Sequence, residues 1–338
     1  MTARRGSIAK RDYHRGLLFL EESLMRRLFL AMTVAIALPS CGGSPEPAQQ
    51  PAPAQPAAAP AAAPAQPPAV KAGWVVQDMR TPESVYLDEG SGYLYVSQID
   101  GQPAEKDGKG RISKLGLDGT VVTADWFTAL NAPKGLRSFG GTLWVADLDE
   151  VIGIDIASAK ETARIKIDGA KFLNDIAIGA EGTVYASDTM ASKIYAVKDG
   201  KASVFAEGEQ LEYPNGLFVE GERLVVGGWG KPEADFSTKV PGRLYALDLK
   251  TKQKTLITKQ PLGNIDGVEQ EARGGYLVTD YMAGKLIQVS PTGESRVVRT
   301  FKPGLADHTF LYAQGDILIA PHMNENTVGA YDISADMK

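Results

Sequence analysis

Six polar residues recur at similar places along the chain, each close to the start of a short apolar run. They occur in "TPESVYL" (81–87), "APKGLRS" (132–138), "FLNDIAI" (172–178), "YPNGLFV" (213–219), "NIDGVEQ" (264–270) and "ADHTFLY" (306–312). The residues are Glu83, Lys134, Asn174, Asn215, Asp266 and His308, with spacings of 51, 40, 41, 51 and 42. Two carboxylates and two amides among them offer hard oxygen donors, so the set could bind a divalent cation if the chain brought its members together.

The donor types favour calcium over the other common divalent ions. Amide oxygens and ligands on separate segments fit the large coordination shell of Ca²⁺ better than that of Mg²⁺. Zinc is disfavoured because His308 and His322 are the only histidines beyond the first 40 residues, and Cys41 is the only cysteine. Taken singly, each Asn or Asp could equally be a turn residue whose side chain bonds nearby backbone. The case for a metal rests on the shared position.

A repeat near 40–50 residues is the signature of a propeller or a solenoid. Each opening is followed by a stronger apolar run that alternates or is rich in β-branched and aromatic residues, as in "YLYVSQ" (93–98), "TLWVAD" (142–147) and "DILIAP" (316–321). Third runs follow in all six units and fourth runs in five. We therefore predict an all-β, six-bladed β-propeller over residues 73–338, in which "GWVVQDM" (73–79) supplies the missing fourth strand and closes the ring.

In a propeller the first strand of each blade lines the central channel, so the six polar residues should form a ring at one end of it. Two long connections, 99–110 and 228–242, follow second strands and should wall a pocket at that end. The second of them carries Trp229, a candidate for substrate contact. Asp147, Asp188 and Asp280 end second strands, where we expect turn-capping roles.

Over nearly all of 73–338 the chain resembles the gluconolactonase/regucalcin family, relatives of diisopropyl-fluorophosphatase and paraoxonase. The motifs "PNGL" and "IDGV" are the closest matches. The resemblance implies one catalytic calcium ion in the central channel, with Glu83, Asn174, Asn215 and Asp266 as ligands. It also implies hydrolysis of a lactone or a related ester as the activity.

The ring residues suggest catalytic and substrate-binding roles. Asp266 is expected to act as a general base toward water, and His308 as a second proton carrier or as a channel-wall residue. His322 could contact substrate or simply occupy a loop. Lys134 departs from the expected pattern, since an ammonium beside calcium is unfavourable; it could bind an anionic group of the substrate, or replace the metal in an inert channel.

The sequence of the N-terminal part predicts a leader followed by a tether. Residues 1–24 are interpreted as an upstream mis-start or an extended basic region, and 25–40 as a lipoprotein signal peptide whose apolar stretch is too short to span a bilayer. Cys41 is the expected lipidation site. The Pro- and Ala-rich residues that follow make 41–72 a disordered tether. Together these features predict a bacterial cell-envelope protein, lipid-anchored in the outer membrane and facing the periplasm.

The net charge of the chain limits the classes of partner that it is expected to bind. The formal net charge of the chain is −5, yet residues 1–40 carry seven basic and three acidic side chains, so the remainder is near −9. This balance argues against nucleic-acid binding. We expect a monomeric calcium-dependent lactonase or esterase-like hydrolase acting on a small molecule. A non-catalytic propeller that binds a protein or glycan, and an enzyme of another reaction on the same scaffold, are the alternatives.

Overall fold

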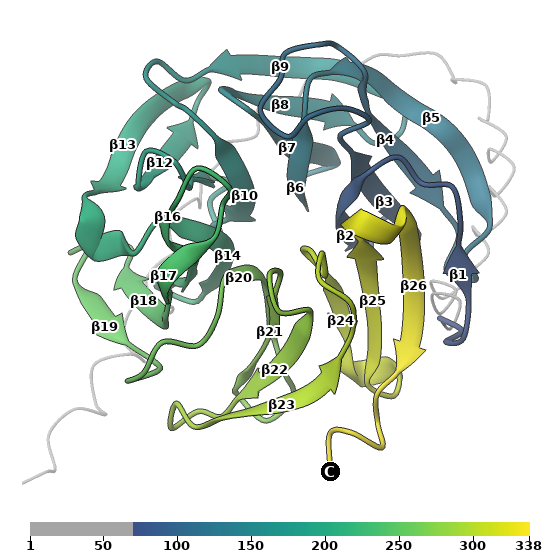
Figure 1. Ribbon diagram of the computed structural model, residues 1–338. Helices are drawn as coiled ribbons and strands as arrows, with labels where there is room; N and C mark the ends of the chain where they lie inside the picture. The colour runs from purple at the N-terminus through teal and green to yellow at the C-terminus, as the bar shows by residue number, and fades with distance from the viewer. Residues whose placement is uncertain (1–69) are drawn as a thin grey trace, which may run out of the picture. The chain divides into compact units, whose positions relative to one another are not determined.

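Six four-stranded antiparallel sheets surround a central channel like the blades of a propeller in the computed structural model, which describes residues 70–338 (Figure 1). The predicted all-β, six-bladed fold is confirmed. The predicted leader, Cys41 and nearly all of the predicted tether lie outside the described residues. Within those residues the only helical segments are three single 3₁₀ turns. None of the helices found there is long and apolar enough to cross a membrane.

Each blade begins with the strand that lines the channel and continues outward in chain order. The first three blades contain β2 (Pro82–Asp88), β3 (Tyr93–Gln98), β4 (Gly110–Leu115) and β5 (Val121–Leu130); β6 (Pro133–Phe139), β7 (Thr142–Asp147), β8 (Glu150–Asp155) and β9 (Lys160–Lys166); and β10 (Leu173–Ile178), β11 (Val184–Asp188), β12 (Lys193–Lys198) and β13 (Lys201–Glu207).

The remaining blades follow the same plan, except that the outermost strand of the sixth blade is β1 from the N-terminal end of the described residues. They contain β14 (Pro214–Glu220), β15 (Arg223–Gly228), β18 (Leu244–Asp248) and β19 (Lys254–Leu256); β20 (Ile265–Gln270), β21 (Tyr276–Asp280), β22 (Lys285–Val289) and β23 (Ser295–Thr300); and β24 (Thr309–Leu311), β25 (Ile317–His322), β26 (Thr327–Asp332) and β1 (Val75–Val76). In the fourth blade an extra hairpin, β16 (Gly230–Pro232) and β17 (Thr238–Pro241), interrupts the order.

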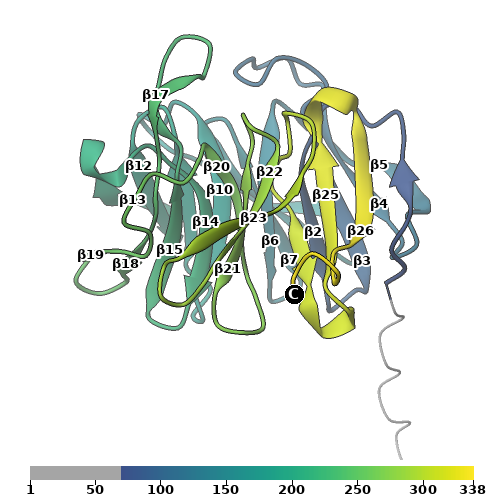
Figure 2. The same ribbon diagram turned by 60° about the horizontal axis from the view of Figure 1, so that its bottom comes forward.

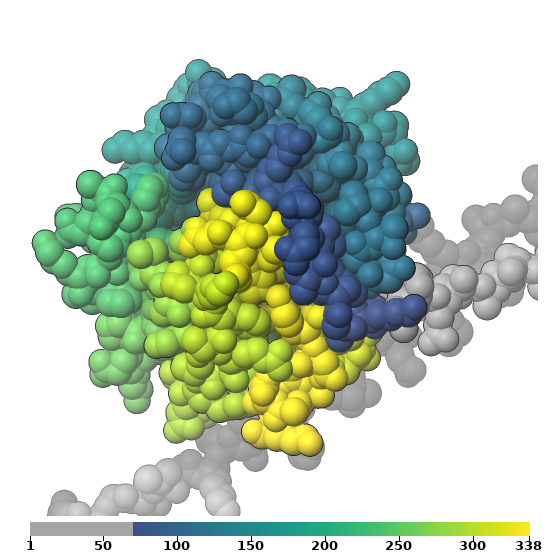
Figure 3. Space-filling model, turned by 45° about the vertical axis from the view of Figure 1, so that its right-hand side comes forward, coloured from purple at the N-terminus to yellow at the C-terminus, as the bar shows by residue number. Residues whose placement is uncertain are grey.

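Closure of the ring takes place in the sixth blade. The short strand β1 pairs antiparallel with β26, so that Val75 lies opposite Gly329. Figure 3 shows this N-terminal segment, in dark blue, lying along the yellow C-terminal strands. The predicted closing strand is confirmed, although only two residues of 73–79 form it. Pairing removes an exposed edge from the sixth blade.

Apolar side chains fill the spaces between neighbouring blades. Between the first and second blades, for example, Tyr95 and Ile112 pack with Leu136, Val145 and Ile152, all fully buried. Alternation along each strand places one set of side chains on each face of the blade, and each face packs against a different neighbouring blade. The blades are therefore locked in register around the channel.

A bulge near the start of the inner strands aims the polar residues at the channel. In five blades the first residue of the inner strand pairs with the last residue of the second strand, and the register shifts just afterwards, as between Pro214 and Leu217. Bulges re-aim side chains in this way. The residue types of Pro214, Asn215 and Gly216 suggest a turn, but all three belong to strand β14. They form the β-bulge at its start rather than a separate turn.

Polar side chains at the ends of the second strands hold the segments that enter the channel. Asp147 accepts hydrogen bonds from the backbone N–H groups of Asn131 (2.8 Å) and Ala132 (2.7 Å). Asp188 likewise accepts from the backbone of Lys171 (2.7 Å) and Phe172 (3.0 Å). The expected capping roles are thus present, and they fix the backbone immediately before the channel-lining residues.

Loss of one such contact should destabilise the fold. Asp147→Ala leaves two backbone donors in a buried region without an acceptor, which should lower the free energy of unfolding by about 2–3 kcal/mol. Chemical denaturation measures this change. The exposed Asp168→Ala serves as the control, with an expected effect within about 0.5 kcal/mol. Equal stability of the two variants would contradict a holding role for Asp147.

Candidate functional site

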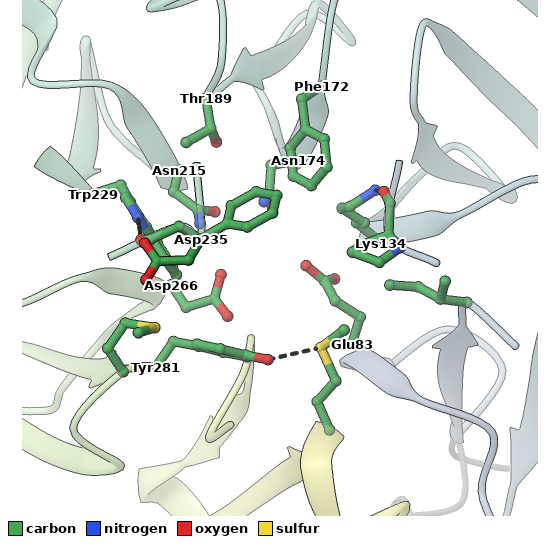
Figure 4. A pocket seen from close by; sticks show the side chains of 15 residues that line it. Glu83, Lys134, Phe172, Asn174, Thr189, Asn215, Trp229, Asp235, Asp266 and Tyr281 are labelled. Carbon is green, nitrogen blue, oxygen red and sulfur yellow. Dashed lines mark hydrogen bonds between the residues drawn. The ribbon is translucent and has the colours of Figure 1, made fainter. Parts of the chain in front are cut away.

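One pocket at the mouth of the channel collects the predicted ligands. Its lining includes Glu83, Asn174, Asn215 and Asp266, drawn from the inner strands of four different blades, together with Lys134 from a fifth. Figure 4 shows Glu83, Asn215 and Asp266 directed toward a common space. All of these side chains are at most 7% exposed. Sequence positions spread over 184 residues therefore converge on a single site.

The sixth blade departs from the predicted ring. Leu305 pairs with His322, the last residue of β25, just as Ile265 pairs with Asp280 in the fifth blade. Ala306 is therefore the structural counterpart of Asp266, and grouping His308 with the ring was wrong by two residues. A gap in the ring is the consequence, because alanine contributes no polar group.

His308 instead occupies a core position. Its imidazole is fully buried, neither ring nitrogen has a hydrogen-bond partner, and it does not line the pocket. Burial, with a smaller contribution from the Arg137 charge, lowers its pKa to about 3. The ring is consequently neutral at physiological pH and packs against Gly267.

Close approach of the inner strands explains the glycines of the "PNGL" and "IDGV" motifs. A Cβ atom on Gly216 would lie 2.2 Å from the carbonyl oxygen of Asp266, and one on Gly267 would lie 2.5 Å from Nδ1 of His308. No side chain fits at such distances. The absence of a side chain after Asn215 and after Asp266 lets adjacent strands come together at the channel mouth.

Crowding of acidic groups dominates the electrostatics of the pocket floor. Burial, reinforced by Asp266, raises the pKa of Glu83 well above its usual value. Burial and the nearby Asp307 carboxylate raise the pKa of Asp266 to about 8, against the opposing effect of a hydrogen bond from Asn215. Oε2 of Glu83 and Oδ1 of Asn215 are buried and have no hydrogen-bond partner. The floor thus presents unpaired oxygen atoms in a region of unfavourable negative charge.

Lys134 lies in the same ring but turns away from the carboxylates. Its Nζ atom donates to the backbone carbonyls of Ala132 (2.9 Å) and Pro103 (3.2 Å) and lies 4.3 Å from the centre of the Phe172 ring. In the part of the chain that the structure describes, Lys134 forms no ion pair within 4.0 Å. Burial lowers its pKa to about 8. The ammonium is thus held by backbone and aromatic groups at the side of the pocket.

Trp229 lines the pocket, whereas His322 does not. The His322 ring packs against Phe301, with 5.2 Å between ring centres, and its Nε2 atom lies 2.9 Å from the hydroxyl of Tyr331. These contacts place it between strands and outside the pocket lining. Of the three predicted substrate contacts, Lys134 and Trp229 line the pocket and His322 does not.

A second layer of charge lies one step deeper in the channel and is not predicted from the sequence. The guanidinium of Arg137 lies 3.1 Å from Glu269 and 3.6 Å from Asp307, and Asp175 is close enough to interact with it. Asp175 and Asp307 each follow a pocket-level position by one residue. Asp175 and Asp307 occupy the same position in their repeats, which is the only sequence feature that links them. The other four blades have Ser84 or a glycine at this position, so the repeat shows no acidic pattern.

The pocket floor fits a hard divalent cation by its chemistry. Two carboxylates and two amides supply oxygen donors, and the unpartnered oxygens are what a cation would satisfy. Within residues 70–338 no group of three or more His, Cys, Asp or Glu side chains is arranged to hold a metal. The predicted ligand set contains only two residues of those types, with Asn174 and Asn215 as the other donors.

Comparison with known proteins identifies the fold. No family model matches the chain, and no curated protein matches by sequence. Among solved structures, a gluconolactonase from Xanthomonas campestris is 16% identical, with a TM-score of 0.56 over 75% of this chain and 86% of that one. The chain, whose motifs resemble those of gluconolactonases, thus also shares its fold with one.

Two further neighbours show the same architecture in other settings. Virginiamycin B lyase from Staphylococcus aureus is 13% identical, with a TM-score of 0.52 over 76% of this chain and 97% of its own. A chain in a nidogen/laminin complex is 15% identical, with a TM-score of 0.56 over 68% of this chain and 88% of its own. At these identities the likeness establishes the propeller fold.

Arg137 should be a strong contributor to stability because it is the cation of the deeper layer. Arg137→Met leaves Glu269 and Asp307 buried without a positive partner, at a cost of about 3–5 kcal/mol. Burial already raises the pKa of Glu269 to about 7 against the opposing effect of Arg137. Without the guanidinium the pKa of Glu269 should rise further. Protonation of Glu269 at low pH should therefore reduce the loss of stability in the variant.

Denaturation of wild type and Arg137→Met at pH 5 and pH 8 tests this expectation. The loss of stability should be larger at pH 8, where the carboxyl groups must ionise in the folded state, than at pH 5. Arg164→Met, which breaks surface ion pairs with Glu150 and Glu161, is the control and should cost about 1 kcal/mol or less at either pH. A loss independent of pH would argue against charge compensation by Arg137.

Proposed function

We propose that the propeller is a calcium-dependent hydrolase of the lactonase type, acting on a lactone or a related ester. The observation that supports this most strongly is the convergence of four oxygen-bearing side chains at the channel mouth, with oxygens of Glu83 and Asn215 buried and unpartnered. Leaving such groups unsatisfied is costly, so their presence favours a ligand that binds them.

Under this proposal Glu83, Asn174, Asn215 and Asp266 hold one calcium ion in the central channel. The chemistry that a bound calcium ion would supply is polarisation of the substrate carbonyl and stabilisation of the negative charge that develops on the carbonyl oxygen. The position of Lys134 supports this assignment: because its Nζ atom is held by two backbone carbonyls beside Phe172, it leaves the space between the carboxylates free. Lys134 then serves the side wall of the pocket, within reach of a polar group of the substrate.

Proton transfer falls to Asp266 in this scheme. Its carboxylate lies at the pocket floor, where it can accept a hydrogen bond from water and take the proton as that water attacks the carbonyl carbon. It can then return this proton to the leaving oxygen when the ester C–O bond breaks. His308 and His322 lie outside the pocket lining, so the proposal gives neither a direct role in the reaction. Trp229 contributes to the wall that excludes bulk water from the floor.

Removal of one amide ligand tests the metal site. Asn215→Ala should weaken calcium binding at least about 10-fold, because it removes a direct oxygen donor. Isothermal titration calorimetry of the metal-stripped protein with CaCl₂ measures this, and circular dichroism checks that the variant is folded. A chelator should abolish lactone hydrolysis by the wild type, and added calcium should restore it.

The exposed Asn324→Ala, which changes the same residue type at the rim, is the matched control and should bind calcium as the wild type does. Calcium binding by Asn215→Ala with unchanged affinity would contradict the assigned ligand set. Hydrolysis that persists in chelator would contradict the mechanism while leaving the site intact.

A non-catalytic binding role is the second candidate. Its support is the structural neighbour found in a nidogen/laminin complex, which shows that a similar propeller can occur in a protein complex. Calcium binding without hydrolysis of any lactone or ester would favour this role, with the ion serving as a structural element of the channel.

We further propose that a lipid on Cys41 anchors the protein in the outer membrane, facing the periplasm. The support is the sequence alone: a basic start, a short apolar stretch and a cysteine directly after it. Cys41→Ser should move the protein from the membrane fraction to the soluble fraction of the cell envelope. Ser44→Ala, three residues further on, is the control and should stay with membranes. Unchanged membrane retention of Cys41→Ser would contradict lipid anchoring.

A further inference from the structure

The walls of the pocket differ sharply from its floor. Above the polar ring, side chains from the loops that follow second strands, together with Phe172, form an apolar enclosure (Figure 4). Its members are Ile99, Phe172, Trp229, Phe236, Met282 and Met323. The hairpin β16–β17, whose turn carries Phe236, projects from the propeller at this end (Figure 2). Several blades thus contribute loop residues to one apolar wall.

Aromatic rings in this wall form two pairs. The ring centres of Phe172 and Phe236 lie 5.6 Å apart with an interplanar angle of 48°, and those of Trp229 and Tyr281 lie 5.7 Å apart at 45°. Separations of this size are typical of stabilising aromatic contacts. Aromatic side chains lose little conformational freedom on binding, so these pairs offer a preformed surface for a flat apolar group.

Most polar atoms in the walls are engaged within the protein, and the charged groups among the lining residues are Lys134 and the exposed Asp235, whose Oδ1 accepts from Ser237. Nε1 of Trp229 donates to the carbonyl of Phe236 at 3.0 Å, and Oγ1 of Thr189 donates to the carbonyl of Pro214 at 3.0 Å. The Tyr281 hydroxyl donates to Sδ of Met323 at 3.3 Å. Few donors remain there for a ligand that carries many hydroxyl groups.

We infer that the substrate is a lactone or ester with a flat apolar body, an aromatic ring being the best fit, and that it is not a polyhydroxylated sugar lactone. This inference rests on the proposed function and adds a substrate class to it. A sugar lactone would lose hydrogen bonds to water on entering and find few partners in the walls besides Lys134 and Asp235, whereas an aromatic body would bury apolar surface against Phe172, Phe236 and Trp229. The carbonyl then points to the polar floor.

Two δ-lactones with the same ring size provide the test. Dihydrocoumarin carries a fused aromatic ring, and glucono-δ-lactone carries hydroxyl groups. For the calcium-loaded protein we expect kcat/KM for dihydrocoumarin to exceed that for glucono-δ-lactone by at least about 10-fold. Equal or faster hydrolysis of glucono-δ-lactone would overturn the inference while leaving the proposed function in place.

Two variants test whether the apolar wall causes the expected preference for an aromatic lactone. Phe236→Ala should lower kcat/KM for dihydrocoumarin about 10-fold, through KM, and change that for the small δ-valerolactone by less than about 3-fold. Val240→Ala, which changes a 63% exposed residue of the same hairpin, is the control and should match the wild type. Equal losses for both substrates would overturn the assigned role of Phe236.

Hydrolysis of neither lactone would count against the proposed function, and binding would then decide the inference separately. Coumarin, an aromatic lactone of the same shape, should bind the protein in calorimetry, and Phe236→Ala should weaken that binding about 10-fold. Absence of coumarin binding, or binding unaffected by Phe236→Ala, would overturn the inference.

Discussion

Negative charge confined in a narrow channel is the constraint on which this structure depends. Five carboxyl groups, those of Glu83, Asp175, Asp266, Glu269 and Asp307, are brought into the channel by inner strands packed too closely for a side chain at Gly216 or Gly267. Two cationic side chains, those of Lys134 and Arg137, accompany them. Such crowding is unfavourable in a buried setting unless further positive charge compensates it.

Positive side chains compensate the buried negative charge unequally at the two levels of the channel. In the deeper layer Arg137 lies between Glu269 and Asp307 and makes ion pairs with both, which gives that layer a resident cation. At the pocket floor Lys134 is held to one side by backbone carbonyls and an aromatic ring, and Oε2 of Glu83 and Oδ1 of Asn215 stay without hydrogen-bond partners. The unpartnered oxygens thus lie at the end of the channel where the loops also supply an apolar wall.

Much of this arrangement follows from the repeat in the sequence. Because the inner strands recur at regular spacing, the blade count, the closing strand and the common position of Glu83, Asn174, Asn215 and Asp266 could be predicted. Whether these four bind calcium stays a prediction. The alignment of the sixth blade was wrong because "ADHT" carries three polar residues after alanine, and only the pairing of Leu305 with His322 shows which position faces the pocket. The contacts of Arg137 were beyond prediction, since they join residues from three blades that share no motif.

The central claim is that one cation occupies the space between Glu83, Asn174, Asn215 and Asp266. Anomalous diffraction from crystals soaked with Tb³⁺, a calcium substitute, locates such an ion directly. The account predicts a strong anomalous peak within coordination distance of these four side chains, with Lys134 still directed at the carbonyls of Ala132 and Pro103. A floor without a peak, with the Lys134 ammonium between the carboxylates, would contradict it.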